Sequence, residues 1–178
     1  MKNRSILGLA LTIVVVVALS GCASSANREG MTAQGVTVAK YHDQTVAVKT
    51  AGGSETGAMD SSNIEDADFK AAIEESIKNS KVFRSVVQGK DSDYELAVSI
   101  VQLDKPVFGL TFTVNLEASW VLVKQSDRSV VMKKSIKSTH SAGFGDAAVA
   151  VTRLRIAVEG AAKSNIEQGL QAISTLTL

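Results

Sequence analysis

The chain has 178 residues and a mass of 18.7 kDa, a length typical of one domain. Its 19 Lys and Arg nearly balance its 18 Asp and Glu, and only 4% of its residues are aromatic, so the composition excludes an ordinary nucleic-acid-binding protein. One Cys and two His exclude an internal disulfide and leave too few ligands for an ordinary zinc site.

The amino terminus has the layout of a secretory signal. Lys2 and Arg4 precede an apolar run from Ile6 to Leu19. A positively charged start followed by a short apolar segment is typical of a signal peptide, whereas a membrane-spanning helix needs about 20 apolar residues. We therefore expect this segment to be a signal peptide that is removed from the mature protein.

The apolar run ends in Leu19, Ser20, Gly21 and Cys22, and this segment resembles the lipobox of bacterial lipoproteins. The resemblance implies that cleavage between Gly21 and Cys22 removes residues 1–21 as the signal peptide. It also implies acylation of Cys22, which would carry a covalent lipid and no other cofactor. Three acyl chains suffice for stable membrane anchoring. Ala23 follows in place of the Asp that retains such proteins in the inner membrane, so the resemblance implies an outer-membrane protein that faces the periplasm.

The segment after Cys22 is polar and built from small residues. It shows no apolar periodicity, so we expect residues 22–35 to be a flexible tether of about 20 Å reach. Residues 36–178 are then a single periplasmic domain. Loss of Lys2 and Arg4 leaves 17 basic against 18 acidic residues, a net charge near −1 for the mature chain.

The first half of the domain predicts a strand, a helix and a second strand. Val46 and Val48 lie in an expected strand over residues 44–50, and the Gly- and Ser-rich residues 51–62 are an expected loop. Apolar residues spaced by four predict a helix over residues 65–80, with acidic residues at its amino end. Residues 82–87 are the expected second strand.

Strict alternation of apolar and polar residues dominates the centre of the chain. It runs from Tyr94 to Ile100 and again from Thr111 to Leu122. Period two with one apolar face is typical of half-exposed antiparallel strands. A further strand over residues 130–139 follows a polar turn, so we expect a three-strand meander.

A long helix is predicted at the carboxyl end. Apolar residues follow one face at helical spacing from Val151 to Leu176, and Asp146 is the expected N-cap. Charged residues spaced by four, Arg155 to Glu167, predict the opposite, solvated face. Gly160 and Gly169 lie within this predicted helix although glycine is unfavourable there, which indicates close packing or a bend.

These elements predict an α+β fold, a two-layer sandwich of a mainly antiparallel sheet (β-α-β, then the meander) and a long C-terminal helix. The segment order, with stretches such as Tyr94 to Leu103 and Arg153 to Ala162, resembles small outer-membrane lipoproteins of the YajG type. It resembles more loosely LptE-like lipoproteins and the auxiliary lipoproteins of envelope lipid transporters.

No catalytic constellation emerges from the sequence. His42 and His140 lie almost a hundred residues apart, no Gly-x-Ser-x-Gly elbow is present, and lipidation would consume the thiol of Cys22. We expect both histidines on the surface. Gly143 and Gly145 flank a turn, and the carboxylate of Asp146 argues against a phosphate site there. The chain is therefore expected not to be an enzyme, with no catalytic or metal-binding residues.

Basic residues concentrate in the second half of the meander, where Asp127 alone opposes them. One interpretation is contact with anionic lipid; the other is protection of a strand edge against pairing with another sheet. The residues are Lys124, Arg128, Lys133, Lys134 and Lys137.

The expected loop between the first two meander strands is unusually apolar, with Val107, Phe108 and Leu110 beside the only Pro. Loops normally carry polar residues. Phe108 either folds back under the sheet or contacts a partner or the membrane interface.

Two functions fit these observations. The first is a non-enzymatic, outer-membrane-anchored lipoprotein that serves envelope assembly or maintenance through an unidentified protein partner. The second is a lipid-handling accessory subunit of an envelope lipid or lipopolysaccharide transport system. Nucleic acid is not an expected partner, and the membrane is contacted through the N-terminal lipid.

Overall fold

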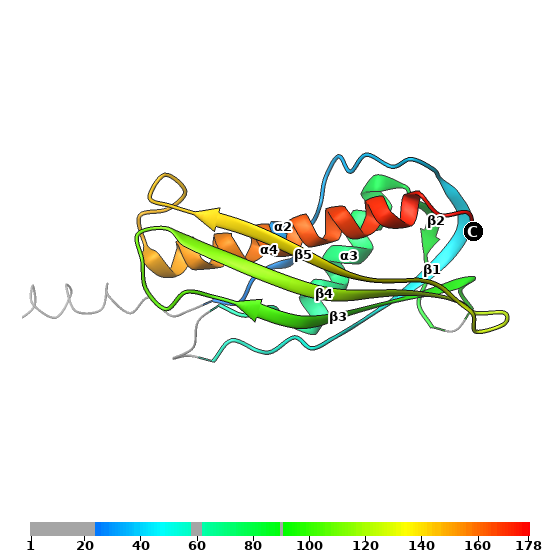
Figure 1. Cartoon of the computed structure of the whole chain (residues 1–178), viewed down its shortest axis with the longest axis horizontal. Helices are drawn as coiled ribbons and strands as arrows, with labels where there is room; N and C mark the ends of the chain where they lie inside the picture. The colour runs from blue at the N-terminus through cyan, green and yellow to red at the C-terminus, as the bar shows by residue number, and fades with distance from the viewer. Residues whose placement is uncertain (1–23, 58–61, 90) are drawn as a thin grey trace, which may run out of the picture.

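The computed structural model describes residues 24–57, 62–89 and 91–178. The predicted signal peptide, Gly21 and Cys22 lie outside the described residues. One sheet with the strand order β2-β1-β3-β4-β5 is covered on one side by helices (Figure 1). Its strands are β1 (His42–Ala51), β2 (Phe83–Val86), β3 (Tyr94–Asp104), β4 (Phe112–Lys124) and β5 (Val130–Ala142). The helices are α2 (Arg28–Met31), α3 (Asp66–Ser80) and α4 (Ala150–Ser174).

The sheet is mixed, and the predicted α+β fold is confirmed. β3, β4 and β5 form the expected antiparallel meander, whereas β1 pairs in parallel with both β2 and β3. Because β1 leads through α3 into the parallel strand β2, this half is a β-α-β unit, which the segment order predicted. The expected strands and helices are all present, with boundaries displaced by a few residues.

The alternation in β3 and β4 separates the two faces of the sheet. In β4 every second residue from Phe112 to Leu122 is buried, and the intervening residues are exposed or partly exposed. The buried set packs against α4, whereas α3 packs against β1 and β2, and these apolar surfaces together form the core. Leu154, Val158, Ile166 and Leu170 of α4 all lie in this core, as predicted.

Trp120 is the centre of the contact between β4 and α4. Its indole is fully buried and its Nε1 donates a hydrogen bond of 2.8 Å to Oδ1 of Asn165. A Cβ atom on Gly169 would lie 2.5 Å from Cη2 of Trp120, so only glycine lets the helix approach the ring this closely. A Cβ on Gly160 would likewise overlap the ring of His140. The two helix glycines therefore mark close packing, one of the two predicted causes.

The amino-terminal segment is not a flexible tether over its described part. Ala26, Met31 and Ala33 are fully buried in the core, and α2 packs against α3 and α4. Asn27 caps α2 by accepting a hydrogen bond of 2.8 Å from the Gly30 amide. The predicted tether over residues 22–35 is wrong for residues 24–33, because three buried residues in a short, polar segment produce no periodic pattern.

The start of α4 also differs from the prediction. Val149, not Asp146, is the N-cap residue, and no side chain caps the helix. The Asp146 carboxylate instead accepts a hydrogen bond of 2.8 Å from the Gly143 amide and closes the preceding turn. The guanidinium of Arg153 holds the loop to the helix by donating to the carbonyl oxygens of Ala147 and Ala148, at 3.0 and 2.8 Å.

Candidate functional site

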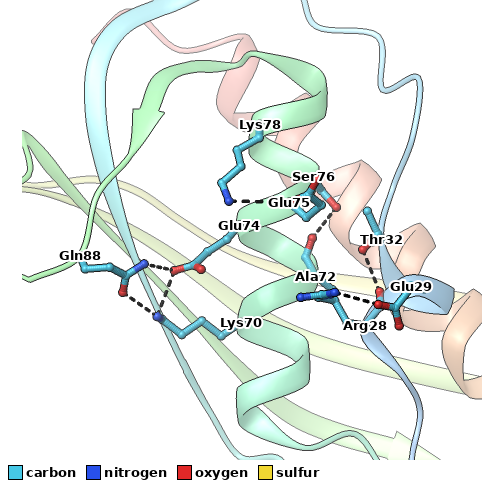
Figure 2. Close-up of polar contacts among 10 residues, drawn as sticks. All are labelled: Arg28, Glu29, Thr32, Lys70, Ala72, Glu74, Glu75, Ser76, Lys78 and Gln88. Atoms are coloured by element: carbon cyan, nitrogen blue, oxygen red, sulfur yellow. Dashed lines mark hydrogen bonds and ion pairs between the residues drawn. The ribbon is translucent and has the colours of Figure 1, made fainter.

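A polar depression of about 670 Å³ lies between α2 and α3. Its charged side chains are paired locally: Arg28 contacts Glu29 at 2.9 Å, and Lys78 contacts Glu75 at 3.7 Å (Figure 2). Nearer the amino end of α3, Lys70 contacts Glu74 at 3.0 Å, and the side chain of Gln88 forms hydrogen bonds with both. The lining residues are Arg28, Glu29, Thr32, Gln34, Glu75 and Asn79.

The two histidines have different environments. His42 is buried, in contrast to the surface position predicted for it, because β1 places it under the end of α4. Its Nε2 lies 3.1 Å from the carbonyl oxygen of Ile173, and its ring contacts Phe83. His140 is exposed, as predicted, and lies against Gly160. Within residues 24–57, 62–89 and 91–178, no three His, Cys, Asp or Glu side chains come together as metal ligands.

Glu159 is a buried acid that the sequence placed on the solvated face of α4. Its carboxylate accepts a hydrogen bond of 3.1 Å from the Asn27 amide and lies 3.6 Å from Nε of Arg155. Burial raises the pKa of Glu159 above its ordinary value, although the Asn27 bond and Arg155 oppose this. Sequence reasoning missed this role because the partner segment lies 132 positions away.

Glu159→Gln should stabilise the fold relative to the wild type, and increasingly so as the pH rises from about 4 to about 7. The raised pKa means that the folded state favours the protonated acid, so the wild type loses stability as pH rises through that pKa. Glutamine keeps an acceptor oxygen for the Asn27 amide without the buried charge. Melting temperatures of both proteins across this range measure the effect, with Glu167→Gln as the control on the same helix. An equal response of the two variants would contradict the prediction.

The predicted basic residues are exposed and spread over half the length of the sheet. Lys124 and Arg128 lie at the β4–β5 turn, whereas Lys133, Lys134 and Lys137 lie along β5. β5 is an edge strand, which is the setting that the edge-protection interpretation requires. Lys137 also pairs with Glu117 of β4 at 3.4 Å.

The apolar loop after β3 extends into solvent. Val107, Phe108 and Leu110 are 93%, 87% and 72% exposed, so Phe108 does not fold back under the sheet. The first of the two predicted alternatives, in which Phe108 packs under the sheet, is therefore wrong. Contact with a membrane or a partner remains a prediction.

A second exposed apolar loop, predicted from the sequence only as a turn, follows β5. Phe144 is 61% exposed and lies above the Arg153 guanidinium, 4.2 Å from Cζ to the ring centre. Val149 and Val151 are also exposed. The apolar residues clustered around Gly143 and Gly145 are the sequence feature that could have predicted this loop. That these residues are all exposed, however, depends on the tertiary fold.

No known family of proteins matches the chain, and no curated protein is similar to it in sequence. Solved structures share its fold. Protein XCC0632 from Xanthomonas campestris, of the DUF330 family, is 13% identical over 79% of this chain and 89% of its own, with a TM-score of 0.59. PelC from Paraburkholderia phytofirmans, crystallised as a dodecamer, is 13% identical over 82% and 95%, with a TM-score of 0.51.

A lipoprotein B from Nitrosomonas europaea is similar over 78% of this chain and 86% of its own, at 15% identity and a TM-score of 0.47. At these identities the likenesses to XCC0632 and PelC show a shared fold and nothing of the chemistry. In the described part of the chain, no helix has the length and apolar character needed to cross a membrane.

Proposed function

We propose that the protein is a bacterial envelope lipoprotein, held in the outer membrane by a lipid on Cys22 and facing the periplasm. The observation that carries the proposal is the signal-like amino terminus ending in Leu19, Ser20, Gly21 and Cys22, in which the only Cys of the chain takes the position of acylation. The position of the folded body supports it. Packing begins at residues 24–26, so cleavage before Cys22 would remove no described part of the core.

Cys22→Ser should move the protein from the membrane fraction to the soluble periplasmic fraction. Without the thiol there is no site for the thioether lipid, and the described domain carries no spanning helix that would replace the anchor. Cell fractionation with salt and alkaline washes, with mass spectrometry of the amino-terminal peptide, measures the effect. Ser20→Ala is the matched control, since alanine keeps a small residue before the cleavage site. A Cys22→Ser protein that is processed and still resists the washes would overturn the proposal.

The role proposed for the anchored domain is non-enzymatic, in envelope assembly or maintenance through a protein partner. The uncovered face of the sheet supports this role, because small and polar side chains such as Ala97, Ser99 and Ser119 lie there only partly exposed while the helices occupy the other face (Figure 1). An uncovered sheet face of this kind offers a surface to another protein.

A photoreactive amino acid at Ser119, on the uncovered sheet face, tests the partner role in intact cells. A discrete crosslinked product is expected from this position and not from Glu75 on α3, which is the control on the helical side. Lipid analysis of the natively extracted protein distinguishes the second function. Stoichiometric phospholipid bound to the domain would favour a lipid-handling accessory subunit over the partner role.

A further inference from the structure

Two apolar loops lie at the same end of the molecule. The loop between β3 and β4 and the loop between β5 and α4 both project beyond the sheet beside the first turn of α4 (Figure 1). Together they form what we call the apolar end. Its exposed side chains are Val107, Phe108, Leu110, Phe144, Val149 and Val151.

The first described residues form hydrogen bonds with segments that lie at this end of the molecule. Nη1 of Arg155, in the second turn of α4, donates to Oγ of Ser24 at 3.1 Å. The amide of Ala26 donates to the carbonyl oxygen of Asn63 at 2.9 Å. Lys105, where the first apolar loop begins, donates to the carbonyl oxygen of Ser62 at 3.0 Å and to Oδ1 of Asn63. The chain therefore enters the folded body close to both loops.

Cys22 precedes Ser24 by two residues, and two extended residues reach about 7 Å. A lipid on Cys22 thus holds the bilayer surface near the amino-terminal half of α4, without the freedom that a long tether would give. The part of the molecule that this short connection brings to the membrane is the one with the exposed apolar side chains.

We propose that the apolar end inserts Phe108, Phe144 and their apolar neighbours into the lipid surface that anchors Cys22, so that the domain stands upright on the membrane. This inference rests on the proposed lipidation of Cys22. Aromatic and aliphatic side chains on loop tips can enter the boundary between headgroups and acyl chains. Insertion then sets the orientation of the domain, while the covalent lipid supplies the attachment.

The distribution of charge favours contact of this end with the apolar layer of the membrane over contact with anionic headgroups. The acidic Asp104 and Asp146 are exposed beside the two loops, whereas Lys105 is only partly exposed and Arg153 is buried. The basic Lys124 and Arg128 lie at the other end of β4, whose 13 residues span about 40 Å. That separation is several times the Debye length of about 8 Å, so these two residues do not reach the headgroups in this orientation.

Photolabelling from the bilayer tests the proposal. The processed, lipidated chain is reconstituted into phosphatidylcholine vesicles that contain a phosphatidylcholine with a diazirine in its acyl chain, and labelled peptides are mapped by mass spectrometry. Labelling is expected in residues 105–111 and 143–149. The double variant Phe108→Ser, Phe144→Ser should reduce it at least fivefold in both loops. The melting temperature in detergent should change only slightly, because both rings are largely exposed and the contact of Phe144 with Arg153 contributes about 1 kcal/mol or less.

Val130→Ser is the matched control, because Val130 is 59% exposed at the β4–β5 end. It should leave labelling unchanged, and its own peptide should carry little label. Equal labelling of both ends, or an unchanged level in the double variant, would overturn the proposal, as would photocrosslinking from position 108 in cells to a protein and not to lipid. The mass of the amino-terminal peptide in the same sample reports lipidation of Cys22 separately. A lipidated protein without loop labelling therefore contradicts only the insertion.

Discussion

Trp120→Ala should lower the free energy of unfolding by about 3–5 kcal/mol, a large part of the 5–15 kcal/mol typical of a domain. The indole is fully buried between β4 and α4, so its removal leaves a cavity beside Gly169. The substitution also removes the donor to the buried Asn165 amide oxygen. Urea unfolding followed by circular dichroism measures the loss. Ser119→Ala, next in the chain but on the uncovered face, should change stability by less than about 0.5 kcal/mol.

A double-mutant cycle with Gly169 tests the same contact from the helix side. Gly169→Ala alone should destabilise, because its Cβ would lie 2.5 Å from an indole that has no room to move. In the Trp120→Ala background the same change should be neutral or stabilising, since alanine is favoured over glycine in a helix by about 1 kcal/mol. Additive effects of the two substitutions would contradict the packing described here.

Met31→Ala should cost about 2–5 kcal/mol, the range for a buried Met, Leu or Ile, although it lies in a segment whose sequence is typical of a linker. Met31 is fully buried where α2 packs against α3 and α4. The measurement is the urea midpoint of the mature chain, and the control is Gln34→Ala, three residues away and exposed. Equal, small effects would mean that residues 24–33 are detached in solution, as a flexible tether would be.

Under the proposed lipidation of Cys22, a packed amino-terminal segment would also restrict how the domain is oriented on the membrane. With a tether of about 20 Å, the domain would rotate freely above the bilayer, and no face would be directed toward it. Because contacts of Ser24, Ser25 and Ala26 with the body begin two residues after Cys22, the attachment point and the orientation become linked. Met31→Ala therefore also serves as a test of whether loosening this segment reduces labelling of the apolar end.

Local patterns in the sequence were sufficient for the fold class. The period-two alternation of β3 and β4 and the helical spacing in α4 assign each apolar residue to a face, because the backbone geometry of a strand or helix repeats over a few residues. The predicted core positions Leu154, Val158, Ile166 and Leu170 follow from this spacing. The lipobox resemblance is also local, since it depends on four consecutive residues.

The tertiary structure alone decided the features that combine distant segments. Burial of Met31, His42 and Glu159 depends on neighbours more than a hundred positions away or on packing without a repeating pattern, as in the bonds from Asn27 to Glu159 and from His42 to Ile173. The sequence showed that the loop of Phe108 is apolar, but its exposure and its position beside the loop of Phe144 follow from the antiparallel order of β3, β4 and β5. Periodicity assigns a residue to a face of its own element, whereas long-range packing decides what that face meets.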